Sequence, residues 1–251
     1  MLGVIVAESY SGRTVLVTGG SSGIGLEICR GLARKGWRVF CHYRSNSDRA
    51  LALKTEIQEM GRECLLVQAD LGNEAGIESV AVRAKELQVD SLVNNAGTYV
   101  CPKPYGELGL KDYVCSFTVN AFAPAILASR LFAGMAERGF GRIVNISSVA
   151  AKYGGGAQSM HYGAAKRALE GVTKTLAREG AFKGVLVNTL RPGVIDTDFH
   201  EKHPKDMAAR IALIPMRRLG EASEVARLAC FLASEENTFI TNETIAVAGG
   251  E

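Results

Sequence analysis

The fold of this chain is decided by the stretch Val15-Leu-Val-Thr-Gly-Gly-Ser-Ser-Gly-Ile-Gly25, in which an apolar run leads into a glycine-rich turn. The run Thr14–Thr18 predicts a buried strand, and residues 24–35 predict an amphipathic helix. Glycines let the backbone approach a pyrophosphate, and a helix N-terminus offers free N–H groups to an anion. A glycine cluster can also be a simple tight turn, but its place between a first strand and a helix favours a nucleotide site. The predicted contacts in the turn are Gly19, Ser21, Ser22, Gly23, Ile24 and Gly25.

The alternation of strand and helix continues along the whole chain. Short apolar strands that alternate with amphipathic helices are typical of βαβ units with right-handed crossovers. We therefore predict an α/β fold class, a Rossmann-type doubly wound parallel sheet of about seven strands with helices on both faces. One domain over residues 1–251 accounts for the length, with 1–10 as a loose lead-in and 197–217 as a lid over the substrate. The predicted strands are 14–18, 38–43, 64–68, 91–94, 142–147, 185–190 and 243–247, and the predicted helices are 24–35, 48–60, 74–87, 112–138, 160–183 and 222–234.

Composition argues against several functional classes. The chain has 251 residues, 47% hydrophobic and 22% charged, which is typical of a soluble globular protein. A net charge of +3, spread along the chain, does not indicate nucleic acid. There is no basic leader and no apolar run near the ~18 residues of a membrane span, so we predict neither a signal peptide nor a membrane segment. Six cysteines without metal-ligand spacing predict reduced thiols in the cytoplasm and no metal site.

The end of the second predicted strand indicates which nicotinamide coenzyme is bound. An acidic residue there would bind the ribose 2′-hydroxyl, whereas an Arg would bind a 2′-phosphate. The sequence is His42-Tyr-Arg-Ser-Asn-Ser47, and the first carboxylate is Asp48. We therefore predict NADP(H) over NAD(H), with Arg44 as the phosphate ligand, although a solvated surface Arg is the alternative. Tyr43 and Ser45 are predicted contacts beside it, and Asn46 is a further candidate hydrogen-bond donor.

A Tyr–Lys pair near the middle of the chain predicts acid–base chemistry. Tyr162 and Lys166 are four residues apart at the start of a predicted helix, so their side chains share one face. A neighbouring ammonium favours the phenolate and lowers the Tyr pKa from its usual value near 10. The spacing alone is weak evidence, because Tyr99 and Lys103 share it in a segment whose prolines forbid a regular helix. A packing Tyr is the alternative for Tyr162.

Together these motifs resemble the short-chain dehydrogenase/reductase family from about residue 13 to residue 250. The resemblance rests on the turn at 18–25, Asn94-Asn-Ala-Gly97, Tyr162 with Lys166, and Arg191-Pro-Gly-Val-Ile-Asp-Thr197. It implies that Tyr162 donates the proton to an alkoxide, while Lys166 lowers the Tyr pKa and binds the nicotinamide ribose. It also implies that Ser148 binds the substrate oxygen and that Asn120 holds a water linked to Lys166. The implied coenzyme contacts are Asp70 and Leu71 at the adenine, Asn95, Ala96 and Gly97 after the fourth strand, Pro192, Gly193, Ile195 and Thr197 at the nicotinamide, and Tyr162 and Lys166 themselves.

Within the family the chain is most similar to the 3-oxoacyl-carrier-protein reductases, whose members are commonly tetramers. Three departures stand out. Ser148 and Tyr162 are one residue further apart than we expect, which leaves Ser147 as a candidate substitute for Ser148. Ala248 stands where Asp is usual, which does not imply a loss of activity. Thr241-Asn-Glu243 replaces Thr-Gly-Gln, so contacts in a homotetramer or dimer are expected to differ.

The irregular segments near the strand ends are expected to form the substrate pocket. Residues 98–105, 152–161 and 197–216 would line it, and their apolar residues suit an acyl chain or a ring ketone. The implied substrate is a small-molecule carbonyl or secondary alcohol, with a 3-oxoacyl thioester as one candidate. An acidic acyl-carrier protein is a candidate partner, docked through Lys183 or the basic lid, although a merely solvated face is the favoured interpretation of that basic region. A regulatory or scaffold subunit that binds the coenzyme without turnover is the alternative function. The basic lid residues are Lys202, Lys205, Arg210, Arg217 and Arg218.

Overall fold

Seven parallel strands form the central sheet of the computed structural model, which describes residues 12–99, 102–198 and 207–251. The strand order is β3-β2-β1-β4-β5-β6-β9. The predicted sheet is confirmed, β1 to β4 match their predicted ranges residue for residue, and β5 begins and ends one residue earlier than predicted. The predicted lead-in at 1–10 lies outside the described residues. The strands are β1 Thr14–Thr18, β2 Arg38–Tyr43, β3 Cys64–Gln68, β4 Ser91–Asn94, β5 Gly141–Ile146, β6 Val185–Pro192 and β9 Thr244–Val247.

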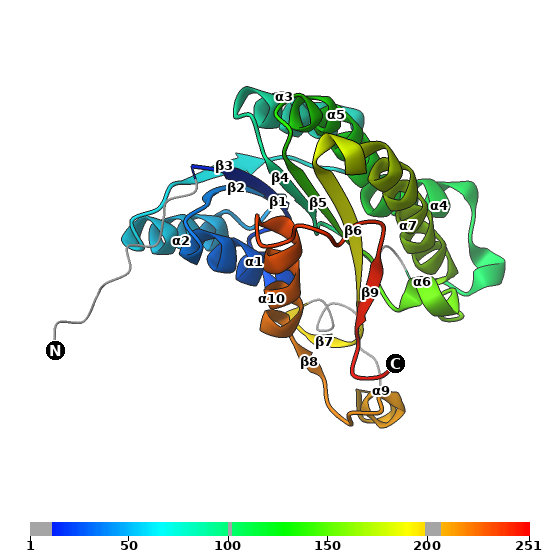
Figure 1. Ribbon diagram of the computed structural model, residues 1–251. Coiled ribbons are helices and arrows are strands. Elements are labelled where there is room, and N and C mark those ends of the chain that lie inside the picture. The colour runs from blue at the N-terminus through cyan, green and yellow to red at the C-terminus, as the bar shows by residue number, and fades with distance from the viewer. Residues whose placement is uncertain (1–11, 100–101, 199–206) are drawn as a thin grey trace, which may run out of the picture.

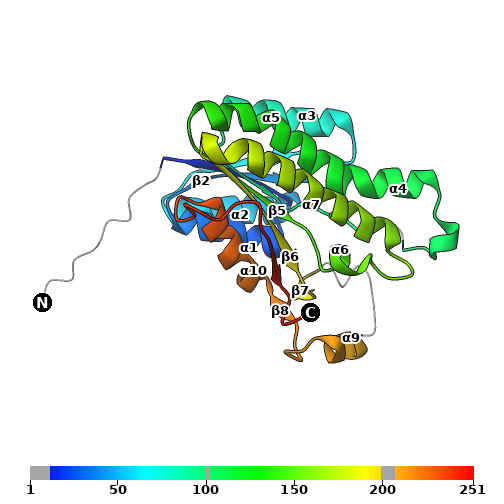
Figure 2. The ribbon, with the colours of Figure 1, turned by 45° about the vertical axis from the view of Figure 1, so that its right-hand side comes forward.

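Helices cover both faces of the sheet, as predicted (Figures 1 and 2). One face carries α1 (Gly23–Arg34), α2 (Ser47–Glu59) and α10 (Ala222–Ala233). The other carries α3, α5 and α7, which lie side by side, and α4, which leads into α5 (Figures 1 and 2). Strand order reverses between β1 and β4, and ligands of such sheets bind outside the carboxyl ends of the strands at this point. The second set of helices is α3 Glu74–Glu86, α4 Leu110–Phe117, α5 Ala123–Glu137 and α7 Met160–Gly180.

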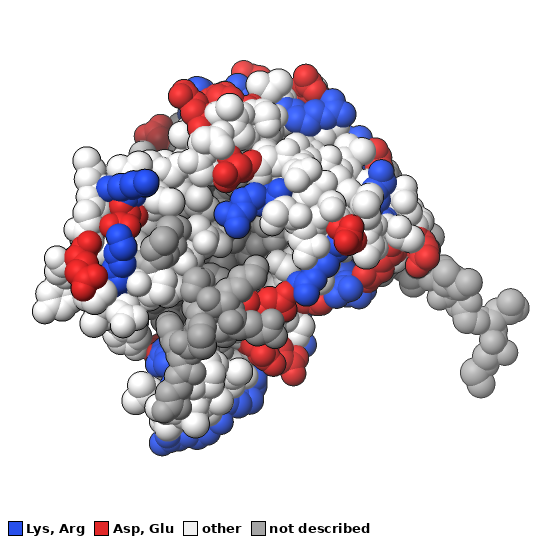
Figure 3. Space-filling view, turned by 180° about the vertical axis from the view of Figure 1, so that it is seen from behind, with Lys and Arg blue, Asp and Glu red and all other residues white. Residues whose placement is uncertain are grey.

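Charged side chains of both signs are interspersed over the face shown in Figure 3. Basic side chains gather at the lower tip of that view, the end at which α9 (Met207–Leu213) lies in Figure 1.

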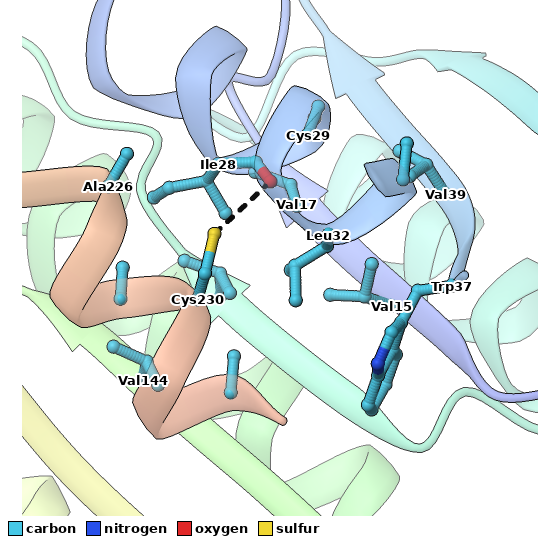
Figure 4. Close-up of a cluster of buried hydrophobic side chains, with 14 of the residues drawn as sticks. Val15, Val17, Ile28, Cys29, Leu32, Trp37, Val39, Val144, Ala226 and Cys230 are labelled. Carbon is cyan, nitrogen blue, oxygen red and sulfur yellow. Dashed lines mark hydrogen bonds between the residues drawn. The ribbon is translucent and has the colours of Figure 1, made fainter. Parts of the chain in front are cut away.

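Alternation along the central strands divides the core into two clusters. Val15 and Val17 of β1 face α1 and α10, whereas Leu16 between them joins the cluster under α3 and α5. Figure 4 shows part of the first cluster, where Ile28 of α1 faces Cys230 of α10, whose thiol donates to the Ile28 carbonyl at 3.6 Å. Both faces of the sheet are therefore buried, which fixes the register of the strands and the position of their carboxyl ends.

The long helix predicted at 112–138 is interrupted. A π-helical turn, Thr118–Phe122, joins α4 to α5, and Asn120 lies buried within it. The combined segment Leu110–Glu137 is long and apolar enough by composition to span a membrane. Its inner residues Leu127, Leu131 and Met135 are instead buried in the core of this fold. π turns within α-helices are frequent at functional sites, so the interruption draws attention to Asn120.

Several short elements at the carboxyl edge were not predicted. They include β7 and β8, which pair with each other, and the helices α6 and α9 (Figures 1 and 2). Hydrophobic periodicity does not reveal these strands of two residues and helices of three to seven residues, because they bury no continuous face of their own. Of the predicted lid at 197–217, residues 199–206, including Phe199, Lys202 and Lys205, lie outside the described residues. The short elements at this edge are η1 Tyr105–Glu107, α6 Ala150–Tyr153, β7 Ile195–Asp196, α9 Met207–Leu213 and β8 Gly220–Glu221, whereas η3 Ala181–Lys183 lies at the opposite edge, at the end of the helix predicted at 160–183.

Candidate active site

The glycine-rich turn has the geometry of an anion cradle. Gly19 has φ +64°, a left-handed conformation that a β-carbon disfavours. A β-carbon on Gly25 would lie 2.3 Å from the Gly19 carbonyl oxygen, so only glycine fits where α1 packs on the turn. Ser22 precedes α1 in extended conformation with no side-chain cap, and the first turn of α1 contains no acidic residue. The first amides of α1 are therefore available to a phosphate group.

Asn95 and Thr18 tie the turn to the end of β4. The Asn95 amide donates to the carbonyl oxygens of Thr18 and Gly19 at 2.9 and 3.1 Å. The Thr18 hydroxyl accepts from the backbone N–H of Asn95 and Ala96 at 3.0 and 2.9 Å. The two strands that flank the reversal of strand order are thus joined by side chains, and Ala96 and Gly97 are held beside the turn.

The loop after β2 presents an exposed cation. Arg44 is exposed, and its carbonyl accepts from the Gln68 amide at 3.0 Å. Ser45 is exposed beside it, and among the described residues no ion pair neutralises Arg44. Asn46 caps α2, because its side-chain oxygen accepts from the Arg49 N–H at 3.2 Å. Asn46 is therefore engaged in the cap, and Arg44 and Ser45 remain available for a 2′-phosphate.

Asp70 and Leu71 follow β3 and have different surroundings. The Asp70 carboxylate accepts from the Gly72 N–H at 2.8 Å and is exposed, whereas Leu71 is buried in the core. The exposed Asp70 lies at the carboxyl edge, where an adenine would be reached.

Ser148 and Tyr162 meet at the carboxyl end of β5. Their side chains are hydrogen-bonded, and the Ser148 hydroxyl also accepts from the Ala150 N–H at 3.1 Å. Burial raises the pKa of Tyr162 to about 12, against a smaller lowering by the Ser148 hydrogen bond. This direction is opposite to the predicted one, because burial of the phenol outweighs any effect of the ammonium. Tyr162 is thus held in the protonated form that a proton donor requires.

Lys166 lies beneath this pair, close to Asn120. Its ammonium nitrogen donates to the Ile146 carbonyl at 2.8 Å and lies 5.9 Å from the centre of the Tyr162 ring. Lys166 is 3% exposed, and burial lowers its pKa to about 8. A β-carbon on Gly97 would lie 3.1 Å from the Lys166 nitrogen and 3.0 Å from the Asn120 side-chain oxygen, so this glycine leaves space for both.

The Asn120 amide is fully committed to the backbone. It donates to the carbonyls of Thr98 and Ser116 at 2.8 and 2.9 Å, and its oxygen accepts from the Thr98 N–H at 3.2 Å. These bonds join the segment after β4 to the π turn. The side chain therefore has a positioning task in addition to the water contact that the resemblance implies.

Ser147 and Ser148 have different partners in the structure. The Ser147 hydroxyl is buried and donates to the Glu170 carboxylate at 2.9 Å. Alternation at the end of β5 sends the two side chains in different directions, and only Ser148 reaches Tyr162. Between Ser148 and Tyr162, Gly154 has φ +83° and ends α6. Ser148 therefore stays the candidate beside Tyr162, and Ser147 is engaged with Glu170.

Glu170 forms a buried network that the sequence did not indicate. Arg191 donates to both of its carboxylate oxygens at 2.6 Å, and Arg167 donates at 3.1 Å. Burial would raise the pKa of Glu170, but the hydrogen bonds of Arg191 and Ser147 and the two Arg charges outweigh it and lower the pKa. The network joins α7, β5 and β6 directly behind the Ser148–Tyr162 pair.

Residues 192–197, the predicted nicotinamide contacts, are held by backbone hydrogen bonds to two neighbouring segments. The Pro192 carbonyl accepts from the Val149 N–H at 3.0 Å, and Gly193 donates to the Val247 carbonyl at 3.0 Å. Ile195 is buried, and the Thr197 methyl would lie 3.2 Å from a β-carbon on Gly23. The segment therefore returns to the glycine-rich turn, so that all the predicted coenzyme contacts except the core residue Leu71 line one edge.

Aromatic side chains form a wall beside Tyr162. The Tyr99 ring packs edge to face on Tyr162 with centres 5.9 Å apart, and its hydroxyl donates to the Gln158 carbonyl at 3.0 Å. His161 is fully buried between Tyr99 and Tyr113, so its place is in the wall and not in the pocket. Backbone bonds from Lys103 to Gln158 and from Tyr105 to Ala157 join two of the three predicted pocket segments. The predicted lining residues Val100 and Cys101 lie outside the described residues.

Comparison with known proteins agrees with this geometry. A family profile described as short chain dehydrogenase matches residues 13–208. The chain belongs to the short-chain dehydrogenase family. This short-chain dehydrogenase is 40% identical over 250 residues to the acetoacetyl-CoA reductase of Rhizobium meliloti (strain 1021), an alignment that covers 95% of the chain and 98% of the relative. It is 37% identical over 247 residues to the 3-oxoacyl-[acyl-carrier-protein] reductase of Escherichia coli (strain K12), with 96% and 98% covered.

Solved structures give the same result for the fold. A blue fluorescent protein from a metagenomic library, in complex with NADPH, has a TM-score of 0.88 at 35% identity, with 95% of this chain and 97% of that chain covered. A 3-oxoacyl (acyl-carrier-protein) reductase from Agrobacterium tumefaciens C58, with NADP bound, has a TM-score of 0.88 at 30% identity, with 100% and 98% covered. The predictions of the family, the doubly wound fold and an oxidoreductase are therefore confirmed.

Proposed function

We propose that this short-chain dehydrogenase reduces the 3-oxo group of an acyl thioester to the 3-hydroxy group, with NADPH as the hydride source. The observation that carries the proposal is the Tyr162 hydroxyl, hydrogen-bonded to Ser148 beside the buried Lys166. The acetoacetyl-CoA and 3-oxoacyl-carrier-protein reductases among the relatives supply the substrate class.

The coenzyme is NADP(H), in agreement with the relatives named as NADP complexes. The glycine cradle and the amides of α1 fit the pyrophosphate, and Arg44 with Ser45 would hold the 2′-phosphate. The coenzyme supplies the hydride and, when oxidised, a positive charge. We expect Arg44→Ala to weaken NADPH binding more than NADH binding, whereas equal affinities for both coenzymes in the wild type would contradict this assignment.

The protein's own residues supply orientation and the proton. Ser148 would donate a hydrogen bond to the substrate oxygen and so stabilise the charge that develops there. Tyr162 would then transfer its proton to that oxygen as an alkoxide forms. Lys166 would bind a ribose hydroxyl. A water held by the Asn120 side-chain oxygen would link Lys166 to solvent, so that the Tyr162 proton can be replaced. These roles are proposals that rest on geometry and family membership.

We propose a coenzyme A thioester in preference to an acyl-carrier protein that docks within one subunit. Lys183 precedes β6 and follows α7, so it lies at the opposite edge of the sheet from Tyr162, roughly 30 Å along a 21-residue helix. In the basic lid, Arg210 pairs with Glu251 and Arg218 pairs with Glu224. These cations are already neutralised and attract an acidic partner weakly.

We further propose a cytoplasmic homotetramer, with a dimer as the smaller alternative. Exposed apolar side chains on α4 and the π turn support association, since Leu110, Val114 and Phe122 are about half exposed or more. Phe239 near β9 is 95% exposed. Light scattering at several protein concentrations measures the mass, and a monomer at every concentration would contradict the proposal.

The substrate class is tested by NADPH oxidation with acetoacetyl-CoA, an acetoacetyl-carrier protein and a panel of small ketones. We expect the thioesters to be the best substrates, with the coenzyme A ester at least as good as the carrier-protein ester. Turnover of other carbonyls alone would retain the chemistry and exclude this substrate class. Tight NADPH binding without any turnover would favour the regulatory subunit.

A further inference from the structure

One buried histidine holds the glycine-rich turn in place. The Gly19 N–H donates to Nδ1 of His42 at 3.2 Å, and the Gly20 N–H donates to the His42 carbonyl at 2.9 Å. The Nε2 atom of His42 lies 3.1 Å from the Ala69 carbonyl. His42 thus joins the ends of β1, β2 and β3 and engages both glycine amides.

These bonds require one neutral form of the imidazole. A backbone carbonyl only accepts and a backbone N–H only donates, so Nε2 carries the hydrogen and Nδ1 is the acceptor. His42 is 2% exposed, and burial lowers its pKa against smaller raising effects of the Ala69 carbonyl and the Asp70 charge. Its sheet neighbours Thr18 and Val67 are uncharged, and the adjacent Cys41 is a buried thiol.

We propose that His42 is a positioning residue for the coenzyme, whose neutral imidazole accepts the Gly19 N–H and thereby orients the turn that receives the pyrophosphate. The proposal rests on the proposed function, since it assigns this turn to NADP(H). A proton on Nδ1 would face the Gly19 N–H, and the two donors would repel each other. The turn would then lose its acceptor, and Gly19, which adopts φ +64°, would be free to reorient. Coenzyme affinity is therefore coupled to the protonation of His42.

Two substitutions test the hydrogen bonds of His42 Nδ1 and Nε2 separately. In His42→Asn the side-chain oxygen stands at the place of Nδ1 and can accept the Gly19 N–H, but it cannot be protonated near neutral pH. In His42→Gln the side-chain nitrogen stands at the place of Nε2 and can donate to Ala69, but the acceptor for Gly19 is lost. Both variants retain a polar group in the same buried space, which limits the loss of stability.

The test is calorimetric titration with NADP⁺ from pH 5 to 8, with thermal unfolding as a check that each protein is folded. At pH 7.5 we expect the Asn variant to bind within about twofold of wild type and the Gln variant about tenfold more weakly, or about 1.4 kcal/mol. Below the His42 pKa, which lies under the usual 6.5, wild-type affinity should fall relative to the Asn variant, approaching about tenfold for each pH unit. Titration of the coenzyme's own phosphate is common to both proteins and cancels in the ratio.

Two results would overturn the assignment of His42. One is equal affinity of the Gln variant and the wild type at pH 7.5. The other is an identical acid dependence in the wild type and the Asn variant, and this comparison stands even where the Gln variant fails to fold. Failure of the proposed function has a different signature, because wild-type protein would then bind NADP⁺ weakly at every pH.

Discussion

Two successive turns of α7 bury charged groups in different ways. Lys166 is enclosed with one carbonyl partner and no ion pair among the described residues, and its pKa falls to about 8. Glu170, four residues later, is equally buried but accepts hydrogen bonds from Arg191, Arg167 and Ser147. The compensated Glu170 reinforces the framework behind the site. Lys166 is buried without a counter-charge, which lowers stability. A role in the proposed chemistry would account for such a residue.

The largest loss of stability is expected when the Glu170 carboxylate, which pairs with Arg191, is removed. Glu170→Leu would leave the Arg191 guanidinium facing an apolar group, and we expect a loss of roughly 3–5 kcal/mol in the free energy of unfolding. The double variant Glu170→Leu with Arg191→Met should recover most of that loss, because neither charge is left unpaired. Urea denaturation of the three proteins measures both values. Equal stability of the double variant and Glu170→Leu would show that the unpaired Arg191 guanidinium is not the source of the loss.

Lys166→Met, in contrast, is expected to raise the free energy of unfolding. A shift of the Lys166 pKa from 10.5 to about 8 corresponds to roughly 3 kcal/mol, an upper bound on the stability that the variant gains at pH 7. Lys174→Met on the same helix is the matched control, because that side chain is exposed and should change stability little. Turnover of Lys166→Met should fall by at least about 100-fold. A variant that is active and less stable than wild type would contradict the comparison.

The pH dependence of stability is a second test of the burial of Lys166 without a counter-charge. The unfolded chain holds the Lys166 proton up to pH 10.5, whereas the folded chain releases it near pH 8, so wild-type stability should rise between these values. Tyr162 acts in the other direction, because its pKa is raised from 10 to about 12 and its contribution falls as pH rises through that range. Unfolding curves at pH 8, 9 and 10 should therefore show a rise in the wild type. The rise should be smaller in Lys166→Met, and an identical rise in both proteins would exclude Lys166 as its source.

The smallest effect is expected at the rim of the network. Arg167 contacts Glu170 but is 64% exposed, so Arg167→Ala should cost only about 0–1 kcal/mol and leave turnover unchanged. Denaturation and rate measurements on one preparation test this. A loss as large as that of Glu170→Leu would mean that Arg167, and not Arg191, provides the compensation.

The contrast also explains what the sequence could predict. The glycine-rich turn and the seven strands are local patterns that spacing predicts. The pair Tyr162–Lys166 is also local, but its spacing became informative only beside the other motifs, because Tyr99 and Lys103 share that spacing. Glu170 meets Arg191 and His42 meets Gly19 through the sheet, from positions about 20 residues apart, and no local pattern signals either contact. The direction of the Tyr162 pKa was predicted wrongly, because a sequence shows the neighbouring charge but not the burial that opposes it.

Turnover of Tyr162→Phe tests the central claim most directly. The measurement is the initial rate of NADPH oxidation with acetoacetyl-CoA, beside direct titration of NADPH into both proteins. The account predicts that Tyr162→Phe loses at least about 100-fold in rate and binds NADPH as the wild type does, because only the proton donor has been removed. A near-normal rate in this variant would contradict the assignment of Tyr162, and with it the chemistry proposed for the site.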